Sequence, residues 1–325
     1  MSVSRPSWKV ALCCLLALLA VPVARADQAR TRLVVFGDSL SDPGNFYAAF
    51  GLSAQAPYAI VPSAPYTIGG HHFTNGKTWA EQLAMRLHSP ASGQAALLGP
   101  GTNTNFAVGG ARARPNAAGF PYYDLTTQVG IYLATFHGRA DGAAVHVVWF
   151  GGNDLRDALA AAATDPTLAT SEAILGEAIQ STASNILSLW AAGARLFLVP
   201  NAPDLSRTPA VEALGPAAVG GALQLTAAYN AALGQTLAQL DGLPGIRLIR
   251  LDDFALLDAV VSNPENFGLE DGSTPCLQFG VVIDAVCEEP REHLFWDGIH
   301  PTTAGHGIVA GAALRALAAA GAVRR

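Results

Sequence analysis

The sequence lacks the features that mark several common classes of protein. It is poor in basic residues, with 19 Lys and Arg against 25 Asp and Glu, so its formal net charge is −6. An acidic surface argues against nucleic acid or an anionic lipid surface as a charge-driven partner. Beyond the N-terminal leader there is no apolar run of bilayer length, no Ser/Gly/Pro-rich linker and no internal repeat. These absences favour a single domain with at most peripheral membrane contact.

Two catalytic motifs are also missing. There is no H-E-x-x-H sequence, and no second histidine cluster accompanies His71 and His72. We therefore expect neither a metal nor another cofactor, and we place this histidine pair on a loop surface. The G-x-S-x-G motif is absent as well, which argues against an α/β-hydrolase.

Residues 1–26 have the composition of a secretory signal peptide. A short basic start precedes an apolar run, 10–23, of about 14 residues, fewer than the ~20 that a membrane span needs. The tripeptide Ala-Arg-Ala that ends at Ala26 is a cleavage sequence. We expect cleavage there, which leaves a mature domain of 299 residues, 27–325, in a secreted or periplasmic location. Its net charge would be −9, because the leader carries three basic residues and no acidic one.

Only two cysteines, Cys276 and Cys287, lie outside this leader. An exported protein meets an oxidising compartment, so we predict a disulfide between them. The alternative is a pair of buried free thiols.

Short apolar runs alternate with longer helical patterns along the mature chain. Runs that are apolar on both faces, as strands of a covered parallel sheet must be, occupy 33–36, 145–150, 195–199 and 246–251. Helices are expected over 78–87, 125–136, 171–192, 217–240 and from about 303 towards 320. This alternation predicts an α/β fold, a doubly wound (flavodoxin-like) parallel sheet with helices on both faces. Two aromatic-rich stretches, 44–72 and 253–296, break the pattern, and we expect functional loops there.

Polar residues follow the first two expected strands, at the edge where open parallel sheets bind ligands. Gly-Asp-Ser, which ends at Ser39, places a serine on a tight turn after the first strand. Gly-Gly-Asn-Asp follows the second strand, and Asn153 can donate a hydrogen bond to a ligand there. Each segment also has a structural explanation: Asp38 as a hydrogen-bonding turn residue, and Asn153 or Asp154 as a helix cap.

Two further segments carry chemistry. Asp297 stands three residues before His300 with a glycine between them, so it can accept the Nδ1 proton and leave Nε2 free for a serine. A turn leading into a capped helix would explain the same residues. The Gly109-Gly110 pair offers backbone N–H groups that suit an oxyanion hole, although alone it is only a glycine turn. His293 is a rival base, but no aspartate stands three residues before it.

These four segments, in this order, resemble the sequence blocks of the GDSL family of the SGNH hydrolases. Residues 73–79 also resemble a segment common in its plant-type and lecithinase/haemolysin-like branch. The resemblance spans 33–308, although 44–72 and 253–292 match no motif. It implies a single SGNH hydrolase domain that is a serine esterase or lipase, acting on a small-molecule or lipid ester.

The resemblance also implies a role for each matched residue. Ser39 would be the nucleophile, His300 its general base and Asp297 the residue that orients the histidine. The oxyanion would be held by the backbone N–H groups of Ser39 and Gly110 and by the side chain of Asn153. Alignment of Asn105 with the leading Asn of its block favours Gly110 over Gly109.

Two other functions remain open at this point. An acyltransferase could use the same residues to move a phospholipid acyl group to another alcohol. A non-catalytic module could use the fold to bind glycan or lipid, which the complete residue set argues against. The sequence leaves open the head group and acyl chain, the oligomeric state, and whether 44–72 is a lid. The aromatic residues of that stretch favour an acyl-chain pocket.

Overall fold

The computed structural model describes residues 1–2, 31–51, 71–116, 123–278 and 286–323. Nearly all of the predicted signal peptide and most of the 44–72 stretch lie outside these residues, so what the sequence predicts for them remains untested. Within the described ranges, no helix combines the length and the hydrophobicity that crossing a membrane requires.

Four parallel strands form the central sheet, in the spatial order in which they occur along the chain. They are β1 (Leu33–Gly37), β2 (Val145–Trp149), β3 (Leu196–Pro200) and β4 (Arg247–Leu251). The predicted runs differ from these strands by no more than one residue at either end. β1 and β2 are buried along their whole length, because both faces of the sheet are covered.

A later segment of the chain adds to the free edge of β1. The N–H of Val35 donates to the carbonyl of Thr104 at 2.9 Å, and the N–H of Phe106 donates to the carbonyl of Val35 at 2.7 Å. This parallel bridge, centred on Asn105, lies on the side of β1 away from β2. The chain order therefore reverses at β1, as in a doubly wound sheet, and ligands bind where this reversal occurs.

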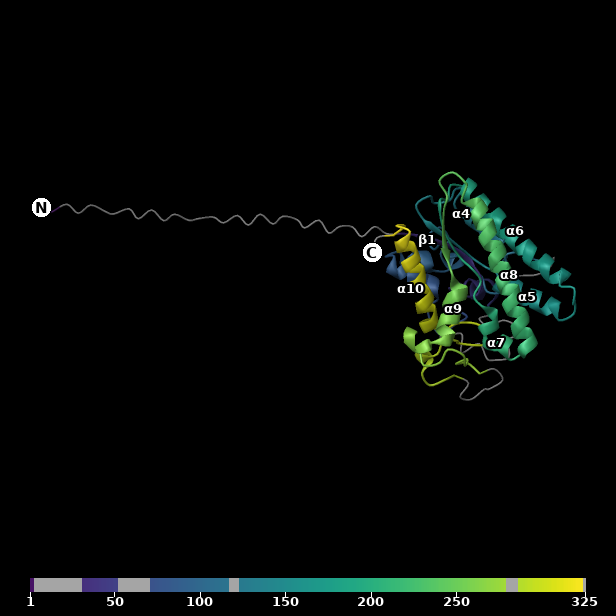
Figure 1. Cartoon of the computed structure of the whole chain (residues 1–325). Helices are drawn as coiled ribbons and strands as arrows, with labels where there is room; N and C mark the ends of the chain where they lie inside the picture. The colour runs from purple at the N-terminus through teal and green to yellow at the C-terminus, as the bar shows by residue number, and fades with distance from the viewer. Residues whose placement is uncertain (3–30, 52–70, 117–122, 279–285, 324–325) are drawn as a thin grey trace.

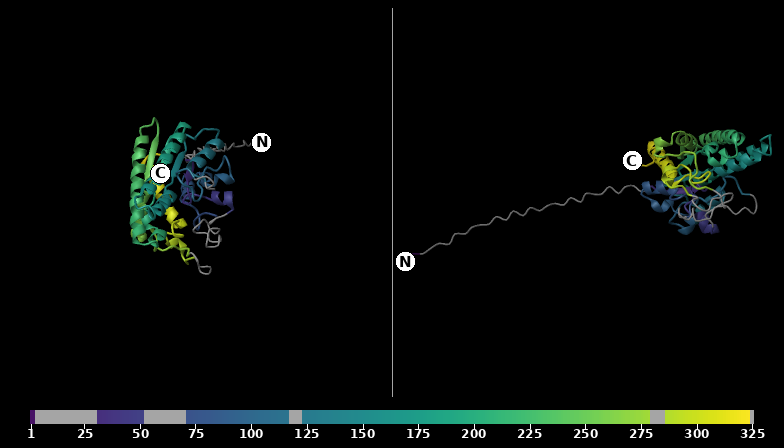
Figure 2. Two further views of the ribbon diagram at one scale, coloured as in Figure 1. Left: turned by 90° about the vertical axis from the view of Figure 1, so that its right-hand side faces the viewer. Right: turned by 90° about the horizontal axis from the view of Figure 1, so that it is seen from below.

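Helices cover both faces of the sheet (Figure 1, Figure 2). One face packs against α4 (Leu125–Thr135), α5 (Gly152–Ala162), α6 (Ala169–Ala191) and α8 (Pro216–Leu240). The opposite face packs against α3 (Trp79–Arg86) and α10 (Thr303–Ala319). Successive strand residues belong to opposite cores, since side chains alternate across a strand: Phe36 faces the first core and Val35 the second. The predicted fold class is confirmed.

Three further helices occur among the described residues. They are α1 (Asn45–Phe50), α7 (Pro209–Glu212) and α9 (Asp253–Ser262). Short 3₁₀ turns occur at Pro90–Gly93, Ala96–Leu98, Leu205–Arg207, Pro264–Phe267 and Pro290–Glu292. The expectation of a loop over 253–296 is wrong for its first ten residues, which are α9. The side chain of Asp252 caps the start of this helix by accepting a hydrogen bond from the N–H of Ala255. The sequence did not indicate a helix here because the apolar residues of α9 are too closely spaced to show a helical period.

Candidate active site

Ser39 lies just beyond the C-terminal end of β1, in a turn that several side chains hold in place. Gln128 bonds both main-chain groups of Gly37: its Oε1 accepts from the N–H at 3.0 Å and its Nε2 donates to the carbonyl at 2.8 Å. Asp38 closes the turn, because its Oδ1 accepts from the N–H of Leu40 at 3.0 Å. The end of the strand is thus fixed to α4, and Ser39 stands at the point where the chain order reverses.

His300 and Asp297 are joined to Ser39 by two short hydrogen bonds. The Nε2 of His300 lies 2.8 Å from the Oγ of Ser39, and its Nδ1 lies 2.6 Å from the Oδ2 of Asp297. The other carboxylate oxygen of Asp297 accepts from the N–H groups of Ile299 at 2.8 Å and His300 at 2.7 Å. The aspartate therefore folds back onto its own turn and holds the imidazole with Nε2 directed at the serine.

The segment that begins at Phe73 braces the turn that carries His300. The hydroxyl of Thr74 donates to the carbonyl of Pro301 at 2.8 Å, and the Oδ1 of Asn75 accepts from the N–H of Thr303 at 2.7 Å. The ring of Phe73 lies 5.5 Å from the imidazole, measured between ring centroids. From the sequence this segment has a family resemblance but no role; in the structure it holds the turn that carries His300.

The glycine turn beside Ser39 includes an amide that no described residue binds. The N–H of Gly109 donates to the Oδ2 of Asp42 at 2.8 Å. Among the described residues, nothing accepts from the N–H of Gly110, whose φ is +75°. A side chain at Gly109 would meet the ring of Phe73, since a Cβ there would lie 2.3 Å from it. Of the two glycines, Gly110 is therefore the one whose amide can serve a ligand.

Asp42 is a residue whose importance the sequence analysis missed. Its carboxylate accepts from the N–H groups of Gly44, Asn45 and Phe46 as well as from that of Gly109. It binds the N–H groups at the start of α1 and also that of Gly109, so it joins α1 to the glycine turn.

Asn153 lies in the first turn of α5 and is held by the main chain of Ala111. Its Nδ2 donates to that carbonyl at 2.9 Å and lies 3.5 Å from the Oδ2 of Asp38. The N-cap of α5 is Gly151, with no side-chain hydrogen bond, so the expectation that Asn153 or Asp154 could cap this helix is wrong. The amide group of Asn153 is directed instead towards the crevice that Asp38 and Ser39 line.

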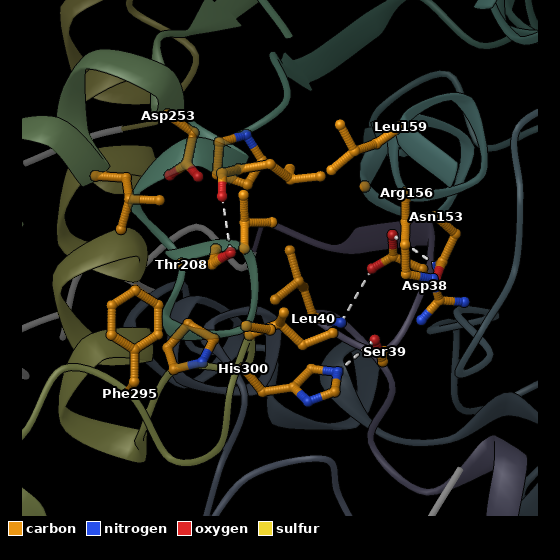
Figure 3. Close-up of a pocket in the computed structure, with 18 of the residues that line it drawn as sticks. Asp38, Ser39, Leu40, Asn153, Arg156, Leu159, Thr208, Asp253, Phe295 and His300 are labelled. Atoms are coloured by element: carbon orange, nitrogen blue, oxygen red, sulfur yellow. Dashed lines mark hydrogen bonds between the residues drawn. The ribbon is translucent and has the colours of Figure 1, made fainter. Parts of the chain in front are cut away.

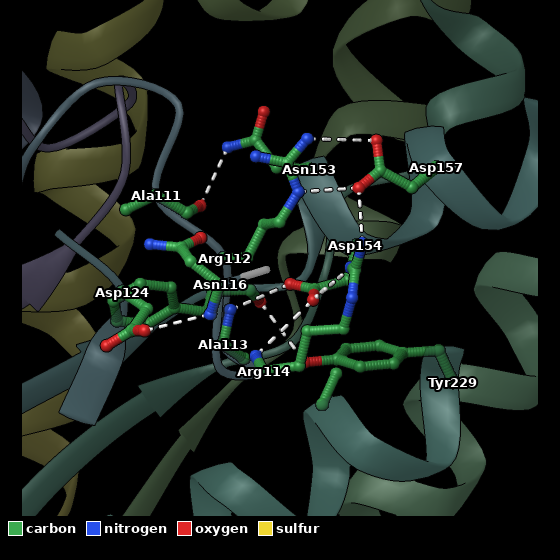
Figure 4. Close-up of polar contacts among 12 residues, drawn as sticks. Ala111, Arg112, Ala113, Arg114, Asn116, Asp124, Asn153, Asp154, Asp157 and Tyr229 are labelled. Carbon is green, nitrogen blue, oxygen red and sulfur yellow. Dashed lines mark hydrogen bonds and ion pairs between the residues drawn. The ribbon is translucent and has the colours of Figure 1, made fainter. Parts of the chain in front are cut away.

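A set of ion pairs fixes the segment next to Ala111 against α5 (Figure 4). Arg114 bonds Asp154 at 2.8 Å and Asp157 at 2.6 Å, and Arg112 bonds Asp157 at 2.5 Å. Asp154 is fully buried and also accepts from the N–H of Ala113 at 2.9 Å. These pairs lock together the two segments that position Asn153.

The other histidines considered from the sequence lie apart from this arrangement. The Nδ1 of His293 lies 3.2 Å from the carbonyl of Thr274. The ring of His71 stacks on Tyr47, and the Nε2 of His72 lies 3.0 Å from a carboxylate oxygen of Glu81. His72 is buried, so its expected place on a loop surface is wrong. No group of three or more His, Cys, Asp or Glu residues suited to a metal occurs among the residues described.

The predicted disulfide between Cys276 and Cys287 is present. The cysteine-bearing segment also pairs with the residues that lead to Asp297. The N–H of Cys276 donates to the carbonyl of Phe295 at 2.9 Å, and that of Leu277 donates to Trp296 at 2.6 Å. These two hydrogen bonds thus join the disulfide-bonded segment to the residues that directly precede the turn that carries His300.

A cavity of about 840 Å³ opens at Ser39 and His300 (Figure 3). Its walls come mainly from α5, α7, α8, α9 and the start of α10, and they are largely apolar: examples are Leu159, Val211, Leu214, Leu257 and Phe295. Pockets of roughly 300–1,000 Å³ with such linings bind small organic ligands. None of the described residues that line this cavity belongs to the 44–72 stretch, for which the sequence favoured an acyl-chain pocket.

Burial and local charges set the protonation of the two site carboxyls in opposite directions. Burial alone would raise the pKa of Asp297, but the charge and hydrogen bonds of His300 outweigh it and hold that pKa below its usual value. Burial raises the pKa of Asp38 to about 6, because its hydrogen bond from Leu40 only partly offsets the lost solvation. Asp297 is therefore the carboxylate that can stabilise an imidazolium.

A serine, a histidine and an aspartate in hydrogen-bonded series, at the switch point of a parallel sheet, form the constellation that serine hydrolases use. The chain belongs more specifically to the family described as GDSL-like lipase/acylhydrolase, whose profile matches residues 33–313. This membership confirms the resemblance inferred from the sequence.

Several known proteins are similar to the chain. Lipase 1 of Photorhabdus luminescens is 32% identical over 200 residues, which make up 60% of this chain but only 26% of that lipase. Phosphatidylcholine-sterol acyltransferase of Aeromonas hydrophila is 31% identical over 277 residues, 81% of this chain and 71% of that enzyme. Among solved structures, an acetylxylan esterase of Geobacillus stearothermophilus is 14% identical with a TM-score of 0.47, and the match covers 89% of this chain and 95% of that one.

Proposed function

We propose that this protein hydrolyses carboxylic esters of apolar acyl groups through an acyl-enzyme on Ser39. The observation that carries the proposal is the hydrogen-bonded series from Asp297 through His300 to Ser39, which ends at the apolar cavity. His300 would take the proton of Ser39 through Nε2 as the serine oxygen attacks the ester carbonyl. The same nitrogen would protonate the departing alcohol and then activate the water that releases the acid.

The oxyanion would be stabilised by three donors around Ser39. These are the backbone N–H groups of Ser39 and Gly110 and the Nδ2 of Asn153. The N–H of Gly110, which no described residue binds, and the fixed side chain of Asn153 support this assignment. Removal of one such donor typically lowers the rate by about 10²–10³.

The acyl group is the part of the substrate that suits the cavity. An apolar cavity of about 840 Å³ next to the nucleophile can bury a medium-length or longer hydrocarbon chain, which gains about 0.8 kcal/mol per buried methylene. A profile of p-nitrophenyl esters from acetyl to palmitoyl tests the proposal. Activity should rise with chain length before it falls, and a protein that cleaves none of these esters would refute it.

Acyl transfer is a second candidate, favoured by the likeness to a phosphatidylcholine-sterol acyltransferase over most of the chain. Transfer and hydrolysis differ only in whether an alcohol or water enters the acyl-enzyme. Adding a primary alcohol or a sterol to the assay and measuring new ester against free acid decides between them.

We further propose that residues 1–26 direct export. The disulfide supports this location, because such bonds persist in oxidising compartments.

A further inference from the structure

Asp253 is a buried carboxyl group in the wall of an otherwise largely apolar cavity. It is the first residue of α9, its side chain lines the cavity, and it is only 4% exposed. Its Oδ1 has no hydrogen-bond partner among the described residues. Buried polar atoms nearly always have a partner, because leaving one without a partner costs free energy. The position of Asp253 therefore needs an explanation.

Capping of α9 does not provide it. The neighbouring Asp252 is the N-cap, and its Oδ1 accepts from the N–H of Ala255 at 3.1 Å and from the Nδ2 of Asn201 at 2.8 Å. The N–H of Asp253 is also satisfied, by the Oδ1 of Asn201 at 2.7 Å. The backbone at this point is thus fully held by other residues, and the carboxyl of Asp253 is left for the cavity.

Asp253 and the reacting groups lie on different parts of the same cavity. Figure 3 shows Asp253 across the cavity from Ser39 and His300, with Thr208 between them. An acyl chain attached to Ser39 and extended into the cavity would therefore bring carbons beyond its carbonyl towards Asp253. Burial, with a smaller contribution from the charge of Asp252, raises the pKa of Asp253 to about 7, so both its protonated and ionised forms are available near neutral pH. Such a group can donate or accept a hydrogen bond.

We propose that Asp253 is a specificity-determining residue that binds a hydroxyl group on the acyl chain of the substrate. The inference rests on the proposed ester hydrolysis and names its substrate class, esters of hydroxylated acyl chains. A hydroxyl fits better than an ammonium group because a neutral group loses far less solvation on entering an apolar cavity. The hydroxyl would give Asp253 its missing partner, whereas a plain chain would leave the carboxyl buried and unsatisfied.

The experiment compares p-nitrophenyl esters of one straight-chain acid, unsubstituted or carrying a single hydroxyl at successive carbons. For each enzyme the readout is the ratio of kcat/KM for the hydroxylated ester to that for the plain ester. This ratio does not depend on the fraction of folded protein. The wild type should prefer at least one hydroxylated ester by roughly tenfold or more. Asp253→Leu should abolish or reverse that preference, and Asp253→Asn, which still hydrogen-bonds, should retain part of it.

Asp258→Leu is the matched control, since it makes the same change on α9 at a residue outside the cavity that is paired with Arg207. It should leave the ratio unchanged. If the wild type cleaves the plain esters but favours none of the hydroxylated ones, or if Asp253→Leu keeps the wild-type ratio, the role of Asp253 is refuted while the proposed function stands. If the wild type cleaves no ester of the series, the proposed function itself fails.

Discussion

The Nε2 atom of His300 lies 2.8 Å from the Oγ atom of Ser39, although 261 positions of sequence separate the two residues. Nothing local brings them together. Ser39 is placed by β1 and by Gln128, and the turn of His300 is placed by Thr74 and Asn75. The hydrogen bond between Ser39 and His300 therefore depends on how the sheet and the segment that begins at Phe73 are placed relative to each other.

Ser39→Ala should abolish ester hydrolysis, with kcat falling at least about 10³-fold, because the nucleophile itself is lost. Far-UV circular dichroism should be unchanged. Ser41→Ala is the matched control. Ser41 is fully buried and its Oγ accepts from the Nε1 of Trp79 at 2.9 Å, so this variant should lose roughly 1–3 kcal/mol of stability and keep its activity. A serine-directed phosphonate should label Ser39 alone. Substantial activity in Ser39→Ala, or labelling of Ser41, would refute the assignment.

Asn153→Ala should lower kcat about 10²–10³-fold with a small effect on KM, because its donor acts on charge that develops in the transition state. Asn185→Ala provides a control for loss of a buried asparagine. The Nδ2 of Asn185 bonds Thr126 and Ser181 away from the cavity, so this change should lower the melting temperature and leave kcat unchanged. A pure KM effect in Asn153→Ala would make Asn153 a substrate-binding residue instead.

The sheet and most of the helices that cover it could be predicted from the sequence, because burial on both faces requires strands that are continuously apolar; α5 was not predicted. β1 and β2 are continuous apolar runs, and α6 and α8 are long enough to show a helical period. α9 escaped because its apolar residues are nearly continuous and its start depends on one capping side chain, Asp252.

Residues whose side chains form hydrogen bonds to positions distant in the sequence could not be predicted. The carboxylate of Asp42 reaches the N–H of Gly109, 67 positions away, and Gln128 reaches Gly37 over 91 positions. Neither residue type nor spacing indicates such a bond. The residues that line the cavity could not be predicted for the same reason, since they are apolar side chains from helices that only the fold brings together. Ser39 and His300 lie in short turns that have recognisable sequence motifs. The residues that hold these turns in place, such as Asp42 and Gln128, belong to no such motif.

Asp38→Asn should change the pH dependence of stability. The pKa of Asp38 is about 6 in the folded protein against 3.8 as its ordinary value, so the unfolded chain loses this proton first as pH rises. In the wild type, stability contributed by this group is present below about pH 4 and is lost as the pH rises towards 6. Asparagine carries no such proton.

Unfolding by urea at several pH values provides the measurement for Asp38→Asn. The free energy of unfolding of the variant, minus that of the wild type, should increase by roughly 2 kcal/mol between pH 4 and pH 7. A difference that stays constant or decreases over this range would mean that Asp38 is not held protonated by burial.

The disulfide should protect the turn of His300 rather than the sheet. Cys276 and Cys287 are 11 positions apart, and the segment they close pairs with Phe295 and Trp296 just before Asp297. A loop this short contributes roughly 3 kcal/mol in the chain-entropy model. Because the residues Phe295 and Trp296 directly precede the turn that carries His300, loss of the disulfide should first change the position of His300.

Replacement of both cysteines by serine should therefore inactivate the enzyme at temperatures where far-UV circular dichroism still reports an intact sheet. Activity and ellipticity are measured on the same samples during a thermal ramp, with the wild type under reducing and non-reducing conditions alongside. The temperature of half inactivation should fall in the variant and in the reduced wild type, while the unfolding temperature of the sheet falls less. Equal shifts of the two temperatures would show that the disulfide stabilises the whole domain, and no shift in either would leave it without the proposed role. Because Ser39 lies just beyond β1 and His300 lies on this turn, a gap between the two temperatures measures how far the histidine can be released while Ser39 stays in place.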